Sequence, residues 1–181
     1  MTVKIWIGNL GKYNDAISHG DWLTIPIADE EDFAEFLEQK CGIGECDEFG
    51  QPYEEWHICD VYSDIPGITI GEYASVREIM ELSELVEEIE SLKDYEYKAC
   101  LAFMEADTDD WKFAIECSES GRYLHLSHID NYYDLGEYWF IESGYRNEMP
   151  EHLIEFFNFE KYGEHCGEQG CMTSYGYFES Y

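Results

Sequence analysis

The sequence EYASVREIMELSELVEEIESL, at Glu72–Leu92, is the stretch that decides the fold. Ser75 and Glu78 form a capping-box pattern, in which each side chain can hydrogen-bond to the backbone N–H of the other. The pattern predicts that a helix starts at Ser75. Apolar residues then recur at steps of three and four, which gathers them on one side of the helix and indicates that this side is buried. These residues are Val76, Ile79, Leu82, Leu85, Val86, Ile89 and Leu92.

The opposite side of this predicted helix is acidic. Its carboxylates are Glu78, Glu81, Glu84, Glu87 and Glu88, with Arg77 as the opposing cation. Like charges at this spacing destabilise a helix by about 0.2–0.5 kcal/mol per pair, so helix stability does not explain the row. Acids three or four positions apart are about 4.5–6 Å apart along the axis, a step comparable with the charge spacing of about 3.4 Å along a nucleic-acid strand. Two interpretations follow: a solvated helix face, or an imitation of nucleic-acid charge.

The composition combines an ordinary core with an extreme surface charge. Of 181 residues, 45% are hydrophobic and 17% are aromatic, which suffices for an ordered core in one to three domains. The net charge is -31, from 41 acidic and 10 basic residues, and it equals the charge on about 50 Å of DNA duplex. Such a charge attracts cationic partners, which favours a basic protein surface as the partner. The acidic surface of a halophilic protein is the alternative, although abundant Tyr, Trp, Ile and Cys fit it poorly.

Several other classes are excluded by the distribution of residues. The basic residues are scattered, so we predict no binding to nucleic acid and none to anionic membranes. The N-terminal sequence MTVKIWIGNLGKY lacks an apolar signal-peptide region, and apolar runs such as Cys100–Met104 are far shorter than the ~20 residues of a transmembrane helix. We therefore expect a cytoplasmic protein. Seven irregularly spaced cysteines are typical of reduced thiols rather than of a disulfide framework.

The first part of the chain is predicted to form an antiparallel sheet with a helix, and the fold class is α+β. The strands, expected from period-two alternation, are Val3–Ile7, Trp22–Ile27 and Glu55–Tyr62. Gly8–Asn14 is expected to be a turn-rich loop. Four acids at Asp29–Asp32 precede an apolar helical pattern that ends near Gly42. Acids in a first turn complement the helix dipole, so this cluster is either structural or part of a mimicking surface.

The second part is predicted to mix helices and strands. The expected helices are Tyr95–Glu105, Asp130–Gly144 and Pro150–Tyr162. The expected strands are Trp111–Cys117, Tyr123–Leu126 and Met172–Tyr181, with turns at Asp107–Asp110 and Ser118–Gly121. In the second of the helices, the residues expected to pack are Leu135, Tyr138, Trp139 and Ile141. The residues expected to face solvent, as a second acidic row, are Asp130, Asp134, Glu137 and Glu142.

No catalytic motif stands out in the sequence. His165 and Cys166 with Cys171, and Cys41 with Cys46, have a spacing that resembles a zinc site only loosely, and free thiols in loops are favoured. The histidines are dispersed and are expected to be surface or packing residues. We predict no metal, no cofactor and no enzymatic activity. A carboxylate-based hydrolase is the alternative from another class; it predicts one indispensable pair of acids, whereas a charged surface predicts graded loss across many.

Several stretches together resemble the ArdA family of antirestriction proteins. The N-L-G-K-Y-N signature of that family is matched by Asn9, Leu10, Gly11, Lys12, Tyr13 and Asn14. Tyr53–Ile58 and Glu72–Ser75 are similar to its acidic Y-E-E-[Y/W] and E-Y-x-S patterns. Leu135 and Gly136 lie within Asp134–Gly144, where the family has its antirestriction motif.

The resemblance implies an elongated chain of three small domains that forms a curved homodimer and imitates bent B-form DNA. The domains would be an N-terminal α+β domain (1–70), a central acidic helical domain (71–105) and a C-terminal mixed α/β domain (106–181). The partner would be the methyltransferase core of a type I restriction–modification enzyme, whose DNA-binding groove the two acidic rows would occupy. Such proteins are typically carried by mobile genetic elements. An acidic mimic or adaptor directed at another basic DNA-binding protein is the alternative.

Overall fold

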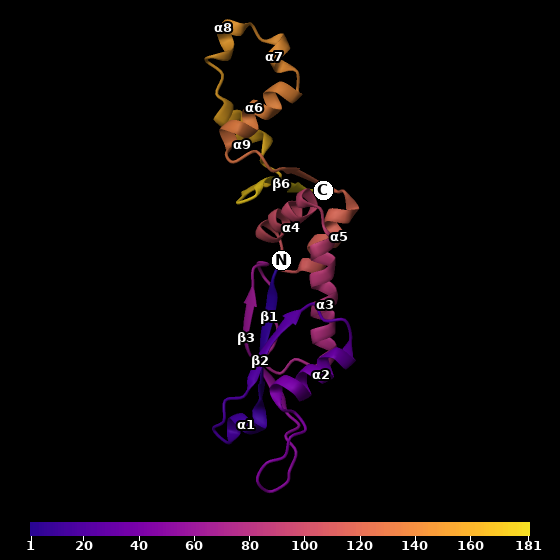
Figure 1. Ribbon diagram of the computed structural model, residues 1–181. Helices are drawn as coiled ribbons and strands as arrows, with labels where there is room; N and C mark the ends of the chain where they lie inside the picture. Colours follow the sequence, from indigo (N-terminus) through magenta and orange to yellow (C-terminus); the bar gives the residue numbers. More distant parts are fainter. The chain divides into compact units, whose positions relative to one another are not determined.

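The computed structural model describes residues 1–181 and contains two small antiparallel sheets and nine helices. The chain forms two compact units, Met1–Ser91 and Leu92–Tyr181, and each is described by itself (Figure 1). The α+β class predicted from the sequence is confirmed. The division into three domains, with a central acidic one, stays a prediction. None of the helices has both the length and the apolar character needed to cross a bilayer.

A three-stranded antiparallel sheet in the order β2-β1-β3 organises the first unit. Its strands are β1 (Val3–Asn9), β2 (Gly20–Ile25) and β3 (Trp56–Ser63). Alternation along β1 buries Val3, Ile5 and Ile7 completely on one face of the sheet. The three strands predicted for this part of the chain are confirmed, with small shifts at their ends.

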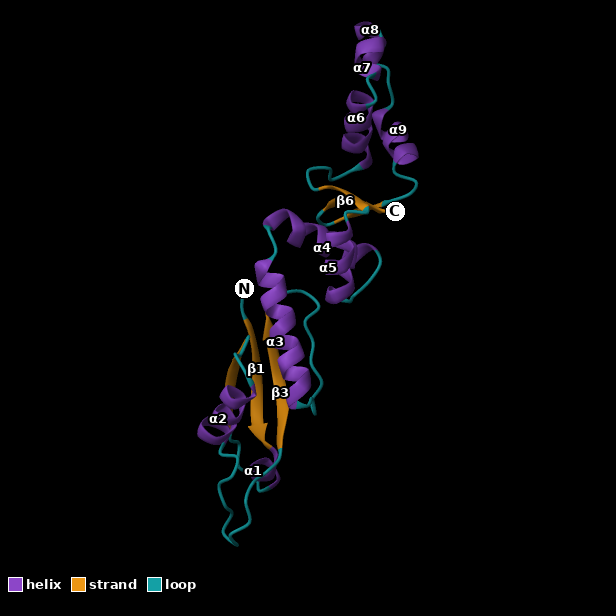
Figure 2. Cartoon of the chain, turned by 90° about the vertical axis from the view of Figure 1, so that its right-hand side faces the viewer, coloured by secondary structure: helices purple, strands orange, loops and turns teal.

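Two helices bury their apolar sides in the first unit. They are α2 (Glu30–Cys41) and α3 (Val76–Ser91). Figure 2 shows α3 running alongside the sheet. Asp29 caps α2 by accepting hydrogen bonds from the backbone N–H groups of Glu31 and Asp32, and Gly42 ends it in a left-handed conformation, with φ 65°. The helix predicted between the acidic cluster and Gly42 is therefore confirmed.

The start of α3 also agrees with the prediction. The backbone N–H of Ser75 donates to Glu78 Oε2 at 2.7 Å, and the backbone N–H of Glu78 donates to Ser75 Oγ at 3.3 Å. Buried Ser83 donates to the Ile79 carbonyl at 3.0 Å and accepts from the Ile27 N–H at 3.3 Å, which ties α3 to the chain that follows β2. Ile79, Leu82, Val86 and Ile89 are buried, whereas Val76, Leu85 and Leu92 are half-buried.

The turn-rich loop predicted at Gly8–Asn14 is wrong. Strand β1 continues to Asn9, and one short helix, α1 (Leu10–Asn14), follows it directly. The Asn9 side chain accepts a hydrogen bond from the Lys12 N–H at 2.9 Å, and Asn is among the preferred residues at this capping position. This cap favours a helical turn where two glycines had suggested a loop.

The second unit contains the other sheet, in the order β4-β6-β5. Its strands are β4 (Tyr123–Leu126), β5 (Cys171–Thr173) and β6 (Gly176–Ser180). Its helices are α4 (Asp94–Ala106), α5 (Trp111–Ser120), α6 (Tyr132–Glu142), α7 (Tyr145–Glu148), α8 (Glu151–Ile154) and α9 (Phe159–Cys166). The single closing strand predicted at Met172–Tyr181 is wrong, because a turn at Ser174 and Tyr175, followed by Gly176 with φ 113°, folds this segment into a hairpin.

The strand predicted at Trp111–Cys117 is wrong as well, because this segment is the helix α5. Asp110 caps it by accepting from the backbone N–H groups of Lys112 and Phe113. Trp111, Ala114 and Ile115 are buried at helical spacing. The ring of Trp111 stacks on Tyr97 of α4, with ring centroids 5.6 Å apart.

Helices in the last third of the chain are shorter than predicted. The helix expected at Pro150–Tyr162 is interrupted, because Asn158 accepts from the Lys161 N–H at 3.0 Å and so starts a separate helix, α9. In α6 the prediction that Ile141 packs is wrong, since 48% of its surface is exposed. Phe140, which is fully buried, packs there instead.

Candidate interaction surface

The acidic row of α3 lies on the outer face of the helix. At about 100° of rotation per residue, Glu81, Glu84 and Glu88 fall within an arc of about 60° on the side opposite the buried residues. Glu78 and Glu87 each lie about 60° beyond one end of that arc. All of these side chains are exposed except Glu81, which is half-buried. The row predicted from the sequence therefore occupies one half of a 16-residue helix.

The five carboxylates of this row differ in how far they are already engaged. Glu78 accepts hydrogen bonds from the backbone and hydroxyl of Ser75, and these bonds lower its pKa. Glu81 pairs with Arg77 at 2.8 Å. Glu84, Glu87 and Glu88 have no cation or hydrogen-bond donor of the chain near their carboxylates. They are therefore the acids of α3 that can pair with a partner at no cost to existing contacts.

The second acidic row is less regular than predicted. Asp130 precedes the helix, because Asn131 is the N-cap of α6. Asp134 accepts from the Asn131 amide at 2.8 Å and is half-buried in this cap. Glu137 and Glu142 are exposed, but they lie about 140° apart around the helix. Two of the four predicted acids therefore belong to the start of the helix.

The family-signature residues at 9–14 form a structural cluster. The Asn9 amide, fully buried, donates to the carbonyls of Cys41 and Gly42 at 3.0 and 3.2 Å. Buried Lys12 reaches Glu45 with Nζ at 2.6 Å from Oε2, and this contact lowers the pKa of Glu45. Lys12 Nζ also lies 5.7 Å from the centre of the Tyr53 ring. These contacts join α1 to the end of α2 and to the loop that follows it.

Gly11 has a packing role in the same cluster. A Cβ atom at this position would lie 2.5 Å from Cδ1 of Tyr53, so only glycine leaves room for that ring. The hydroxyl of Tyr53 in turn donates to Asp15 at 3.0 Å. Leu10 and Asn14 border a groove that is described below.

The remaining family-motif residues, Leu135 and Gly136, hold α6 against α9. A Cβ atom at Gly136 would lie 2.8 Å from the Phe159 carbonyl carbon and 2.9 Å from the Gly163 nitrogen. Fully buried Leu135 packs in the core formed with Leu126, Ile129 and Tyr177. Glycine at this crossing lets two helix backbones touch, and the motif therefore shapes the second unit from inside.

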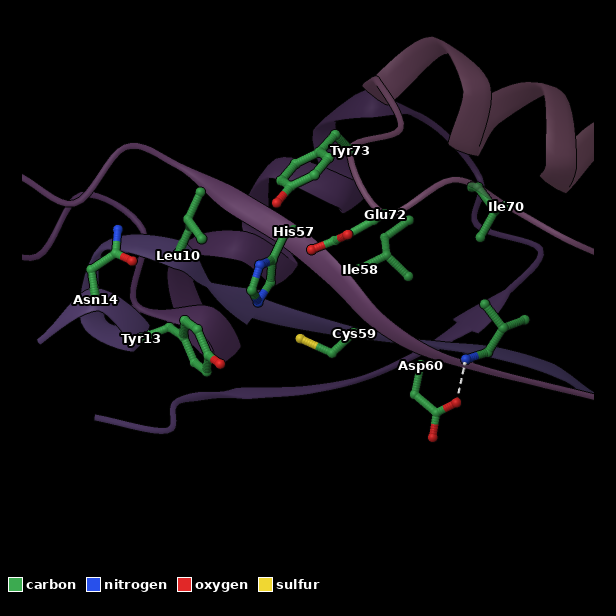
Figure 3. A pocket seen from close by; sticks show the side chains of 11 residues that line it. Leu10, Tyr13, Asn14, His57, Ile58, Cys59, Asp60, Ile70, Glu72 and Tyr73 are labelled. Carbon is green, nitrogen blue, oxygen red and sulfur yellow. Dashed lines mark hydrogen bonds between the residues drawn. The ribbon is translucent and has the colours of Figure 1, made fainter. Parts of the chain in front are cut away.

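A groove of about 700 Å³ beside the outer strand β3 was not expected from the sequence (Figure 3). The backbone N–H of Ile58 donates to the carbonyl of Glu72 at 2.8 Å, which brings the segment before α3 alongside β3. Strand β3 bulges at Cys59, because Trp6 pairs with Asp60 and Ile7 pairs with Ile58. No local sequence pattern signals this approach, because residues 72 and 58 are adjacent only after folding.

The polar groups of the groove come from β3, from the segment beside it and from α1. His57 is only 6% exposed, and its Nδ1 has no hydrogen-bond partner. The sequence had placed His57 among the surface or packing residues, and its burial agrees with a packing position. Asp60 accepts from the Val61 N–H at 2.8 Å (Figure 3). The neighbouring carboxylate of Glu72 raises the pKa of Tyr73.

The cysteine and histidine pairs considered from the sequence do not converge. Cys41 is buried, with its Sγ 3.4 Å from the Ile7 carbonyl, and burial raises its pKa to about 11. Cys46 is exposed in a loop. His165 contacts Glu168 at 3.0 Å. No group of three or more His, Cys, Asp or Glu side chains is arranged to hold a metal ion.

Comparison with known proteins places this arrangement in a family. A family model described as antirestriction protein (ArdA) matches residues 5–179, nearly the whole chain. No curated protein matches the sequence. The matched range contains the signature cluster at 9–14, the row on α3 and the α6–α9 crossing. The chain therefore belongs to the ArdA family of antirestriction proteins.

Proposed function

We propose that this antirestriction protein acts as a DNA mimic. Its carboxylates occupy the DNA-binding groove of a type I restriction–modification enzyme, at the methyltransferase core, and block both restriction and modification. It acts in the cytoplasm as a homodimer. The observation that supports mimicry most directly is that Glu84, Glu87 and Glu88 are exposed and unpaired on one regular helix.

The physical basis is the same as for DNA binding. A basic groove and a polyanion both hold counterions, and these ions are released when the two surfaces meet. Glu81, Glu84 and Glu88 follow one another at about 4.5–6 Å along the helix axis, a step comparable with that of phosphates along a strand. Because each exposed ion pair contributes only about 0–1 kcal/mol, the affinity comes from many pairs together.

Three acids on α3 provide the test. In the variant Glu84→Gln, Glu87→Gln, Glu88→Gln, we expect inhibition of DNA cleavage and of methylation by a purified type I enzyme to weaken about tenfold, at roughly 0.5 kcal/mol per lost pair. Folding should not suffer, because these substitutions remove repulsion between like charges. The control removes the same charge from exposed, unpaired acids of the second unit, in Glu148→Gln, Glu151→Gln, Glu155→Gln.

The salt dependence separates mimicry from other functions. Binding through several ion pairs should weaken steeply between about 50 and 200 mM salt, and an affinity unchanged over that range would contradict mimicry. Equal losses in the two triple variants would show that net charge matters rather than the row on α3. Complete loss of inhibition on substitution of a single carboxylate would instead favour the carboxylate-based hydrolase.

A further inference from the structure

We propose that the groove beside β3 binds a guanidinium group, the side chain of an arginine presented by the partner protein. The groove is lined by the aromatic rings of Tyr13 and Tyr73, the imidazole of His57, the thiol of Cys59 and the carboxylates of Asp60 and Glu72. It lies in the first unit and is formed without any acid of the α3 row. The proposal rests on the proposed function only in taking the arginine from the restriction–modification enzyme.

The unpartnered imidazole is the observation that points to a ligand. His57 is 94% buried, being 6% exposed, and its Nδ1 meets no donor or acceptor of the protein. Buried polar side-chain atoms are nearly always hydrogen-bonded, so an unpaired one beside a groove indicates a missing partner. In Figure 3 the His57 ring stands between Tyr13 and Glu72, among the side chains that line the groove.

The fold makes space for this imidazole. A Cβ atom at Gly8 would lie 3.0 Å from His57 Nε2 and 2.9 Å from Cys59 Sγ, so glycine on β1 allows both side chains to lie across it. The bulge turns the side chain of Cys59 out of the regular alternation of β3. Because water does not reach Nδ1, a ligand must displace a neighbour. The rings of Tyr13 and Tyr73, which line the groove, are 63% and 69% exposed.

Charge decides which ligand suits the groove. A neutral imidazole can accept a hydrogen bond at Nδ1 or donate one, depending on its tautomer. The carboxylates of Asp60 and Glu72 line the same groove and no Lys or Arg does, so an anion would be repelled. A cationic donor satisfies the imidazole lone pair and the carboxylates together.

The shape of the ligand follows from the aromatic rings. A guanidinium is flat, stacks on aromatic faces and directs several N–H donors into one plane, whereas the lysine ammonium is a compact and strongly hydrated charge. Tyr13 lies 5.6 Å from His57, ring centre to ring centre, and Tyr73 lines the same groove as Glu72. One guanidinium can therefore stack on a tyrosine and donate to both His57 and Glu72.

The test titrates the whole protein with N-acetyl-L-arginine amide and follows its histidine imidazole nitrogens by NMR. We expect saturable, millimolar binding that shifts the His57 Nδ1 signal, and binding of N-acetyl-L-lysine amide that is at least about fivefold weaker. Glu72→Gln should weaken the arginine probe about fivefold, whereas Glu31→Gln, which removes an exposed acid of α2 outside the groove, should change it less than about twofold. His57→Asn retains an acceptor near Nδ1 and should bind better than His57→Leu.

Three results would overturn the proposal: equal binding of the arginine and lysine probes, equal effects of Glu72→Gln and Glu31→Gln, or an unmoved His57 signal. Tighter binding of free L-arginine than of the blocked probe would also overturn it, because it would indicate an amino-acid ligand instead of a protein side chain. Mimicry is judged separately, by the triple variant of α3. Loss of inhibition in that variant without any binding of the arginine probe would reject the groove alone.

Discussion

Replacing Asn9 by Ala should destabilise the first unit more than any surface substitution. The Asn9 side chain is fully buried and makes three hydrogen bonds. Its amide donates to the carbonyls of Cys41 and Gly42, and its oxygen accepts from the Lys12 N–H at the start of α1. Alanine removes all three bonds and leaves the Cys41 carbonyl and the Lys12 N–H without a partner, whereas the Gly42 carbonyl still accepts from the Glu45 N–H at 3.4 Å.

The size of the effect follows from these contacts. A hydrogen bond contributes about 1 kcal/mol net, and a buried group left unpaired costs about 1–3 kcal/mol. Three bonds lost at one buried position therefore lower the free energy of unfolding by about 3 kcal/mol. With an m-value of about 2 kcal/mol/M, the urea midpoint of the first unit falls by about 1.5 M.

The assay is urea unfolding, with hydrogen exchange read by mass spectrometry to assign the loss to the first unit. Asn14→Ala is the matched control, because Asn14 is exposed at the end of the same short helix and should change the midpoint by less than about 0.3 M. Asn9→Asp keeps the acceptor for the Lys12 N–H but loses both donors, so its urea midpoint should lie between those of Asn9→Ala and Asn14→Ala. An Asn9→Ala midpoint equal to that of the control would refute the argument from buried hydrogen bonds.

Three further outcomes follow from the same structure. Gly136→Ala should lower the free energy of unfolding by about 2 kcal/mol in urea titrations, because its Cβ would overlap the Phe159 carbonyl of α9; an unchanged midpoint would contradict this contact. Hydrogen bonds with Ser75 lower the pKa of Glu78, so their stabilisation is present above the usual value of 4.5 and is lost as the pH falls below it; amide exchange at the start of α3 should accelerate there, and Glu78→Gln should remove the effect. Iodoacetamide at pH 8 should label Cys46 but not Cys41, whose pKa is about 11, until urea is added; equal labelling would refute its burial.

The parts of the fold that the sequence predicted are those with strong local signals. The cap of α3 and its apolar spacing identify that helix, and alternation identifies β1 and β3. The errors arise where local patterns are ambiguous. Trp111–Cys117 is apolar enough for a strand, and only the Asp110 cap and the stacking on Tyr97 decide for a helix. The sequence of the tail is typical of one strand because the short turn at Ser174 and Tyr175 leaves the alternation on both sides intact.

The candidate sites show the same division. The acids of α3 share one helix face because of their spacing, which the sequence contains. The sequence also predicted the bond from Ser75 to Glu78, as part of the capping box. It did not predict the ion pair from Arg77 to Glu81, which depends on rotamers. The groove depends on β3 meeting the segment before α3, a contact between distant residues with no local pattern.

The high negative charge of this chain opposes its folding but favours its proposed function. The net charge of -31 means that carboxylates repel one another within each compact unit. Salt that screens this repulsion therefore favours the folded state. The same salt weakens attraction to a basic partner. Buried, uncharged contacts such as those of Asn9 and Gly136 stabilise the fold without reducing the surface charge. Among the family-motif residues, Asn9, Lys12, Leu135 and Gly136 are buried, whereas Tyr13 and Asn14 are exposed. The unpaired acids of α3 that are proposed to bind the partner, Glu84, Glu87 and Glu88, are exposed. The contacts that stabilise the fold and the charges proposed to bind the partner therefore belong to different residues.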